Sequence, residues 1–176
     1  MFSIIIPTFN NIQYLKKCIE SLKKNSKFNH QIIVHINEGA DGTLDFVKNN
    51  EIEYTYTREN IGMPKALNLA ARKAKCDYIL ISHDDFYYCP GWDIEFDNEI
   101  NLLDHNKFYL SGTMVGAGQV QFDAGQTAKS FNEEKLIKNL ENIKTFDFQG
   151  TTKCPGLVHI DVWNDLGGWS EEFSPT

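Results

Sequence analysis

Residues 76–92, CDYILISHDDFYYCPGW, contain the strand from which the fold can be inferred. The apolar run 78–81 is rich in aromatic and branched side chains and predicts a strand buried on both faces. It stops at 82–85, SHDD. Two adjacent carboxylates at the end of a buried strand repel one another, and a divalent cation is the simplest compensation. A solvated Asp-Asp turn is the alternative interpretation.

Before this strand, the order strand, loop, helix occurs three times. The predicted strands are 2–6, 32–36 and 53–57, and the predicted helices start near residues 12, 44 and 64. We expect Pro7 to end the first strand because it lacks the N–H that a central ladder needs. Asn10 or Asn11 is available as N-cap of the first helix. The alternation predicts an α/β fold with a mainly parallel sheet flanked by helices on both faces.

In such sheets, ligands bind at the carboxyl ends of the strands. Residues 8–10, 37–38 and 83–85 would therefore lie along one edge and converge on one crevice. After residue 92 the alternation weakens. The predicted elements there are a helix at 94–103, a strand at 108–115, a helix after the capping-box sequence 130–133, and a strand at 157–163. His159 in that last strand would reach the same edge, with a core or surface histidine as the alternative.

Length, net charge and cysteine spacing argue against several classes of protein. With 176 residues, 41% of them apolar, the chain is predicted to form one domain. A net charge of −7 argues against binding of nucleic acid. The four cysteines lack CxxC spacing and no apolar leader opens the chain, so we expect a reducing compartment. No apolar run of membrane-spanning length exists. We expect a cytoplasmic protein, compatible with peripheral association with the inner membrane face.

Five stretches, in this order, resemble the motifs of family-two glycosyltransferases with the GT-A fold. They are SIIIPTFNN at 3–11, INEGADGT at 36–43, NIGMPKALN at 60–68, HDDFYYCPGW at 83–92 and LGGWSEEF at 166–173. No single stretch is specific, but the ordered set covers almost the whole chain. The resemblance implies a GT-A, Rossmann-like fold with a mainly parallel central sheet.

The resemblance also implies an activity. It is the transfer of a sugar from a nucleoside diphosphate sugar to an acceptor hydroxyl, with inversion, in polysaccharide or glycoconjugate synthesis. A UDP-sugar is the favoured donor, with GDP or dTDP as alternatives, and the acceptor would be a glycan or a lipid-linked molecule. Mn²⁺ or Mg²⁺ would bridge the diphosphate and the protein. Within a single domain 1–176, residues 1–92 would form the donor-nucleotide half and 93–176 the start of the acceptor half.

Site residues follow from the same motifs. Those that the resemblance assigns to the donor nucleotide are Pro7, Thr8, Asn10, Asn37, Glu38, Asn60, Gly62, Lys65, His83 and Asp84. Asp85 is the expected direct metal ligand, with Asp84 as the second candidate. Trp92 and Trp169 are candidates for the acceptor side, with core packing as the alternative.

Departures from the family pattern affect these assignments. Ser82 stands where the D-x-D motif has its first aspartate, and Asn37 stands where an acidic residue is usual. The general base normally follows the GGW sequence, so we expect it beyond Thr176, in a part that this catalytic domain lacks. Glu171 and Glu172, the last acidic residues before that point, are the candidates for the base within the chain.

Two other functions compete with this one. The chain could be a nucleotide-sugar-binding module without catalysis, an interpretation supported by the missing base motif. It could also be a sugar nucleotidyltransferase, but residues 8–11, TFNN, carry no positive charge for a triphosphate.

Overall fold

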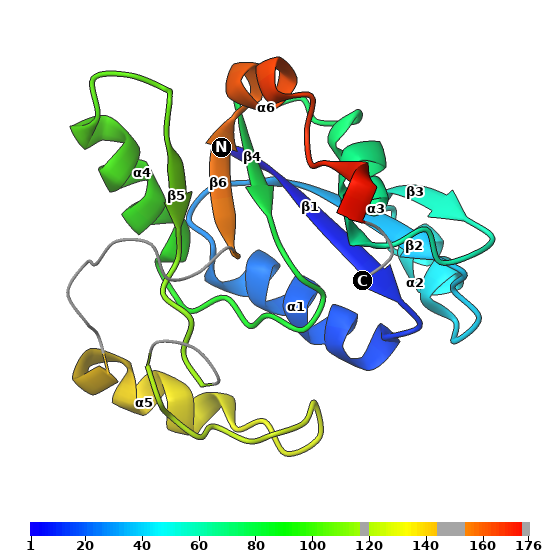
Figure 1. Cartoon of the computed structure of the whole chain (residues 1–176). Coiled ribbons are helices and arrows are strands. Elements are labelled where there is room, and N and C mark those ends of the chain that lie inside the picture. Colours follow the sequence, from blue (N-terminus) through cyan, green and yellow to red (C-terminus); the bar gives the residue numbers. More distant parts are fainter. Residues whose placement is uncertain (117–119, 144–153, 174–176) are drawn as a thin grey trace.

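A computed structural model, which describes residues 1–116, 120–143 and 154–173, contains a six-stranded sheet in the order β3-β2-β1-β4-β6-β5. Helices cover both of its faces (Figure 1). The strands are β1 (Phe2–Phe9), β2 (Gln31–Asn37), β3 (Glu53–Thr57), β4 (Tyr78–Ile81), β5 (Tyr109–Ser111) and β6 (Gly156–His159). The helices are α1 (Ile12–Asn25), α2 (Thr43–Asn49), α3 (Met63–Ala71), α4 (Trp92–Leu102), α5 (Glu133–Ile143), α6 (Ile160–Leu166) and the 3-10 helix η1 (Glu171–Phe173).

The first four strands are parallel, as the alternating sequence predicts. β1 pairs with β2 on one side and with β4 on the other, and β3 pairs with β2. β6 is antiparallel to both of its neighbours, β4 and β5. The predicted α/β class with a mainly parallel central sheet is therefore confirmed.

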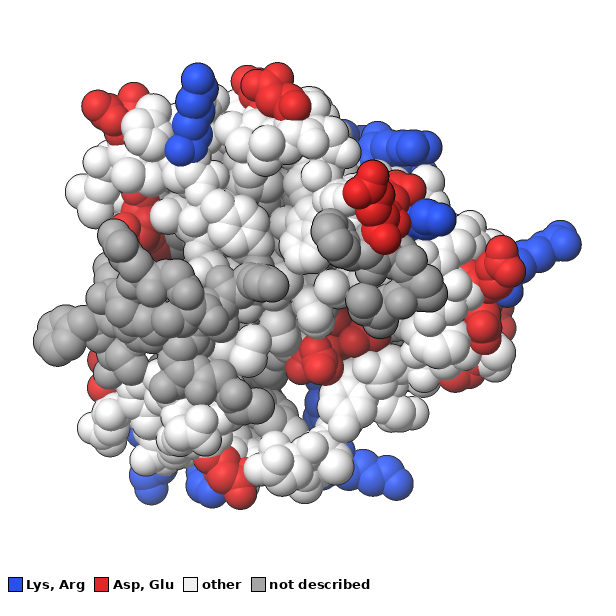
Figure 2. Space-filling model, in the orientation of Figure 1, with Lys and Arg blue, Asp and Glu red and all other residues white. Residues whose placement is uncertain are grey.

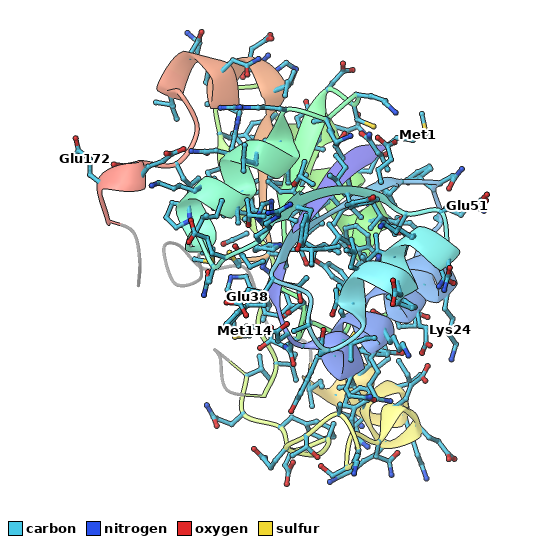
Figure 3. The ribbon with its side chains drawn as sticks, turned by 90° about the vertical axis from the view of Figure 1, so that its right-hand side faces the viewer. Met1, Lys24, Glu38, Glu51, Met114 and Glu172 are labelled. Atoms are coloured by element: carbon cyan, nitrogen blue, oxygen red, sulfur yellow. The ribbon has the colours of Figure 1, made fainter. Side chains whose placement is uncertain are left out.

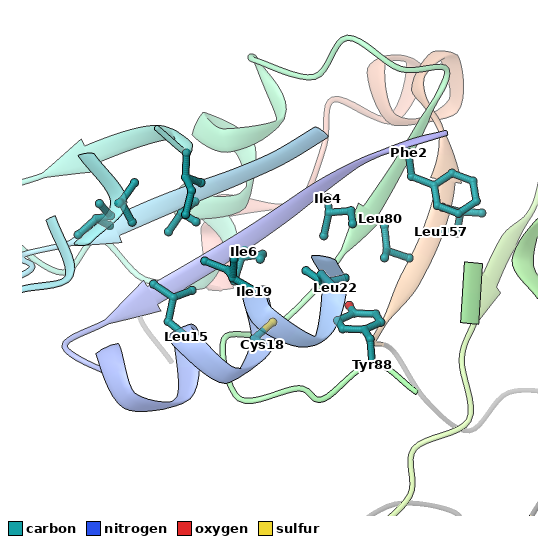
Figure 4. Close-up of a cluster of buried hydrophobic side chains, with 14 of the residues drawn as sticks. Phe2, Ile4, Ile6, Leu15, Cys18, Ile19, Leu22, Leu80, Tyr88 and Leu157 are labelled. Atoms are coloured by element: carbon teal, nitrogen blue, oxygen red, sulfur yellow. The ribbon is translucent and has the colours of Figure 1, made fainter. Parts of the chain in front are cut away.

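The core has two layers because successive side chains of a strand point to opposite faces. On one face, Ile4 and Ile6 of β1 pack with the apolar stripe of α1, which includes Leu15, Ile19 and Leu22 (Figure 4). The other face carries Ile5, Ile33 and Ile79, which pack against Leu67, Ala70 and Ala71 of α3. Burying one such Leu or Ile side chain contributes about 1.5–3 kcal/mol. Both layers together fix the strands whose ends form the site.

Pro7 does not end β1, contrary to expectation. β1 pairs with β2 through Phe9, whereas its ladder with β4 stops at Ile5 and Ile81. The Ser82 N–H donates to the Ile5 carbonyl, so the backbone of Ile5 faces β4. Backbone groups alternate in direction, so the nitrogen of Pro7 faces the β4 side as well. Its missing N–H ends the ladder with β4 only.

The expected strand at 157–163 is also only partly correct. It divides into β6 and α6, with His159 as N-cap of α6, where its ring nitrogen Nδ1 accepts from the Asp161 N–H. His159 pairs with Tyr78 at the start of β4, so it lies at the amino end of the sheet and not at the carboxyl edge. β5 is shorter than expected. α5 is capped by Asn132 instead of Ser130, because Asn132 Oδ1 accepts from the Lys135 N–H.

One buried histidine predicts how stability depends on pH. His35 of β2 is fully buried, with Nδ1 2.7 Å from Thr55 Oγ1, and burial lowers its pKa from 6.5 to about 4. Between those values the unfolded chain binds a proton that the folded chain does not. We therefore expect His35 to cost up to about 3 kcal/mol of unfolding free energy as the pH falls from 7 to 4.

Urea unfolding at a series of pH values would measure this loss. His35→Gln should show a shallower decline over that pH range, while other groups, including His30, whose pKa burial also lowers, contribute the same decline in both proteins. Parallel stability curves for the wild type and the variant would contradict the role assigned to His35.

Candidate functional site

The carboxylate of Asp84 is held at the carboxyl end of β4 by two side chains of the β1–α1 segment. Thr8 Oγ1 donates to Asp84 Oδ2 at 2.6 Å, and Asn11 Nδ2 donates to Asp84 Oδ1 at 3.1 Å. Thr8 is buried on the part of β1 that extends beyond the β4 ladder. Both carboxylate oxygens thus have a donor, and the orientation of Asp84 is fixed before any ligand binds.

The charge of Asp84 is only partly compensated by its surroundings. Burial raises the pKa of Asp84, and the hydrogen bonds from Thr8 and Asn11 lower it only in part. The neighbouring charge of Asp85 raises the pKa of Asp84 further. Within the described residues, no Lys or Arg forms an ion pair with either carboxylate. A bound cation would therefore stabilise the charged form of both.

Asp85 differs from Asp84 in being exposed and unengaged. No other side chain of the described chain hydrogen-bonds to its carboxylate. The described residues also contain no cluster of three His, Cys, Asp or Glu side chains that could form a closed metal cage. One fixed and one free carboxylate fit Mg²⁺ or Mn²⁺, which take one or two protein carboxylates and complete their shell with phosphate and water.

A second group of contacts joins the ends of β1 and β2. Asn10 Nδ2 donates to Glu38 Oε2 at 3.1 Å, and Asn10 Oδ1 accepts from the Ala40 N–H at 2.8 Å. Asn10 and Glu38 both have left-handed backbone, with φ of 48° and 61°. Such a conformation costs about 1–3 kcal/mol for a residue like Glu38 and is concentrated at functional sites. With this backbone conformation, the side chains of Asn10 and Glu38 meet across the edge of the sheet.

The third predicted motif is tied to the same edge. Asn37 Oδ1 accepts from the Ile61 N–H at 3.0 Å and from Thr57 Oγ1 at 3.3 Å. Asn60 Oδ1 accepts from the Gly62 N–H at the start of α3. Asn37 is buried, and the two hydrogen bonds that its Oδ1 accepts fix the β3–α3 loop against the end of β2. Lys65 is exposed on the first turn of α3.

Acidic side chains lie near the middle of the face shown in Figure 2, bordered mostly by uncharged residues. Figure 3 shows Glu38 close to the middle of the molecule, whereas Glu172 stands at its outer margin on η1. Glu171 accepts a hydrogen bond from Asn68 of α3 at 2.9 Å. Among the hydrogen bonds of the described residues, none joins Glu171 or Glu172 to Asp84.

The aromatic and histidine candidates are placed differently from one another. Trp92 packs against Phe2 and His30 at the amino ends of β1 and β2, with ring centroids 6.1 and 5.1 Å away. That position corresponds to the core-packing alternative, away from the carboxyl edge. Trp169 lies against α3 through Asn68. His83 precedes Asp84 directly, and its ring stacks on Phe86 with a centroid distance of 5.1 Å.

Two residues at the edge were not assigned a binding role from the sequence. Asn11 stands at the N-cap position of α1, yet its side chain makes no capping bond and holds Asp84 instead. Asp41 Oδ2 accepts from the Ile12 N–H at 2.7 Å and takes over that capping function. Phe9 is 47% exposed between Thr8 and Asn10, although apolar rings of this size are usually buried. A large aromatic residue in an otherwise polar loop was the sequence signal that could have marked Phe9 as a candidate for a binding role.

Known proteins share both the sequence pattern and the fold. Residues 3–154 match the profile described as glycosyl transferase family 2. The chain belongs to glycosyltransferase family 2. An uncharacterized glycosyltransferase of Rickettsia typhi is 34% identical over 184 residues, with all of this chain and 55% of the relative covered. The chain thus spans about half the length of that relative.

Solved structures confirm the GT-A architecture. S. aureus TarS, residues 1–349, superposes with a TM-score of 0.71 at 16% identity, covering 99% of this chain and 52% of TarS. TarS has also been solved with UDP-GlcNAc. The mannosyltransferase PcManGT of Pyrobaculum calidifontis, solved with GDP-Man and Mn²⁺, superposes with a TM-score of 0.62 at 18% identity, covering 97% of this chain and 48% of PcManGT. At these identities the likeness concerns the fold.

In the part of the family-two chain that the structure describes, every helix is too short or too polar to cross a bilayer.

Removing the Thr8 hydroxyl should change how Asp84 titrates. Its hydrogen bond stabilises the charged carboxylate, and such bonds contribute about 1.5–3 kcal/mol. Thr8→Val should therefore raise the pKa of Asp84 further above its usual value. Carboxyl carbon shifts in an NMR titration would report it, with Thr127→Val, in an exposed loop that contacts Ser130, as the matched control. An unchanged or lower pKa in Thr8→Val would show that the contact does not hold the charge.

Proposed function

We propose that this chain forms the donor-binding part of a metal-dependent, inverting glycosyltransferase that uses a nucleoside diphosphate sugar. The observation that carries the proposal is the pair of neighbouring carboxylates at the end of β4. Asp84 is held at both oxygens by Thr8 and Asn11, and Asp85 is exposed and free. Residues 1–92 would form the donor half and 93–176 the start of the acceptor half, in a cytoplasmic enzyme of polysaccharide or glycoconjugate synthesis.

Mn²⁺ or Mg²⁺ would be bound directly by Asp85 and supported by Asp84. When bound, the ion supplies positive charge that stabilises the diphosphate as the sugar–phosphate bond breaks. The protein's own contribution is to keep Asp84 ionised and oriented through Thr8 and Asn11, since those two donors oppose the effect of burial on its pKa. Glu38 and Asn10, joined at the ends of β2 and β1, present hydrogen-bonding groups to a base or ribose.

A UDP-sugar is the proposed donor. TarS, which superposes on nearly all of this chain, has been solved with UDP-GlcNAc and with UDP. The GDP-Man complex of PcManGT makes GDP the main alternative. The exposed ring of Phe9, at the end of β1, offers a flat apolar surface on which a base could stack. Asn60, Gly62 and Lys65 would border the same pocket from the β3–α3 loop.

The alternative function, a nucleotide-sugar-binding module without catalysis, has one observation in its favour. An inverting transfer needs a carboxylate close to the acceptor hydroxyl, and Glu171 is already bonded to Asn68 while Glu172 points outward (Figure 3). Turnover of the donor sugar by a chain extended beyond Thr176 would exclude this alternative. A glycan or lipid-linked acceptor is part of the leading proposal.

Calorimetric titration with UDP, GDP, CDP and dTDP, each with Mn²⁺ or with EDTA, tests the proposal. We expect one nucleotide, UDP, to bind in a metal-dependent way. Asp85→Asn keeps the side-chain size and removes the charge, and it should weaken binding in Mn²⁺ by at least about 10-fold, because a direct metal ligand is lost.

Asp97→Asn serves as the control, since the Asp97 carboxylate of α4 is half-buried and, among the described residues, accepts a hydrogen bond only from Asn101. It should bind the nucleotide like the wild type. Equal affinity with Mn²⁺ and with EDTA would contradict the metal assignment. Failure of all four nucleotides to bind would overturn the donor-site proposal as a whole.

A further inference from the structure

The side chain of Asn68 joins α3 to the segment Gly167–Phe173, about a hundred residues later in the sequence. Its Oδ1 accepts from the Trp169 N–H at 2.9 Å. Its Nδ2 donates to the Trp169 carbonyl at 2.9 Å and to Glu171 Oε1 at 2.9 Å. One amide therefore satisfies both backbone groups of Trp169, as a neighbouring strand would, and also orients a carboxylate.

The fit around this amide is close. Both Gly167 and Gly168 have left-handed backbone, with φ of 76° and 79°. A Cβ atom on Gly168 would lie 2.4 Å from Asn68 Oδ1 and 3.3 Å from the indole of Trp163. Only glycine at this position lets the segment approach α3 closely enough for the Asn68 contacts to form.

The segment runs alongside the helix that starts at the candidate donor site. Figure 1 shows η1 beside α3, after the chain has passed down from α6 at the amino end of the sheet. α3 starts at Met63, directly after the loop that Asn37 and Asn60 shape. At 1.5 Å per residue, Asn68 lies about 8 Å along the axis from that start. The segment is thus anchored about one and a half helical turns from the loop that starts at the candidate donor site.

We propose that Asn68 is a positioning residue, which fixes segment Gly167–Phe173 on α3 so that this segment borders the sugar end of the donor site. The proposal rests on the proposed function for its second half, the contact with the sugar. Asn68 itself touches neither donor nor metal. It acts through Trp169 and Glu171, and it sets where the chain that follows α6 meets the donor half.

The chemistry of the three contacts explains why asparagine is needed. Trp169 offers a donor and an acceptor, and Glu171 offers an acceptor. Aspartate could still accept from the Trp169 N–H, but it would place a second negative charge against Glu171 and against a carbonyl. Alanine would remove all three bonds. The two variants therefore separate the contact to the N–H from the other two.

Amide hydrogen exchange of the 176-residue chain, followed by NMR, tests the anchoring. We expect the Trp169 N–H to exchange at least about 10-fold faster in Asn68→Ala than in the wild type, with the amides of β1 and β4 unchanged. Asn68→Asp should keep part of that protection. Asn139→Ala is the matched control, because among the described residues the side-chain amide of Asn139 hydrogen-bonds only to the Lys135 carbonyl of its own helix. Equal exchange at Trp169 in the wild type and in Asn68→Ala would overturn the proposal.

A comparison of UDP with UDP-GlcNAc, both in Mn²⁺, tests the contact with the sugar. In the wild type, the amide signals of Trp169 and Glu171 should shift with UDP-GlcNAc and not with UDP. In Asn68→Ala that difference should disappear, although UDP binds with an affinity within about 2-fold of the wild type. A purely structural role would leave both signals indifferent to the sugar, and that result would overturn the positioning role.

The two levels of the argument fail in different ways. If neither UDP nor UDP-GlcNAc shifts any signal, the proposed function is wrong for this donor, and GDP-Man replaces it in the same comparison. If no nucleotide or nucleotide sugar binds, the positioning role is overturned along with the proposed function. The exchange rate of the Trp169 amide still decides whether Asn68 holds the segment.

Discussion

The whole site depends on the missing N–H of Pro7. A parallel ladder continues only while each residue that faces the neighbouring strand donates its N–H to that strand and accepts from it at its C=O. Pro7 faces β4 and cannot donate, so β4 pairs with β1 as far as Ile5 and Ile81 and no further. On its other side, β1 continues beside β2 to Phe9. The chain after Ser82 is thereby released from the sheet and turns Asp84 back over the extended end of β1. There Thr8 is already in place to bind it.

That arrangement stabilises a charge distribution which is otherwise unfavourable. A half-buried carboxylate beside another carboxylate favours the protonated form, and two neutral hydrogen-bond donors offset only part of this effect. The remaining deficit is the physical reason for expecting a cation, independently of any resemblance. It also explains why Asp84 and Asp85 have different roles. Asp84 is immobilised by its two donors and can define a direction, while Asp85 keeps its oxygens free for a ligand.

The sequence was sufficient for the parallel part of the fold, where each strand is followed by a helix with a clear apolar stripe. It was insufficient after Trp92. An apolar run such as 157–163 has no period that separates a strand from a buried helix, and β6 and α6 divide it at His159. Strand direction is equally hidden, because β6 enters the sheet antiparallel to β4 and carries His159 to the amino end. Pro7 was a correct signal for one of its two ladders, since a sequence does not show which neighbour a proline faces.

At the site, the carboxylates and the amides were not equally predictable. Asp84 and Asp85 stand out locally, because two charges at the end of an apolar strand need an explanation within a few residues. Asn11 and Asn68 do not, because their partners lie 73 and 101 residues away. An amide at a helix start or on a helix face fits ordinary capping and surface roles equally well, and only the folded chain shows what it reaches. Their contacts join stretches that are far apart in the sequence: Asn11 links the start of α1 to Asp84, and Asn68 links α3 to the segment after α6. The motifs supply the charges of this site, whereas single amides outside the acidic motif determine where those charges lie.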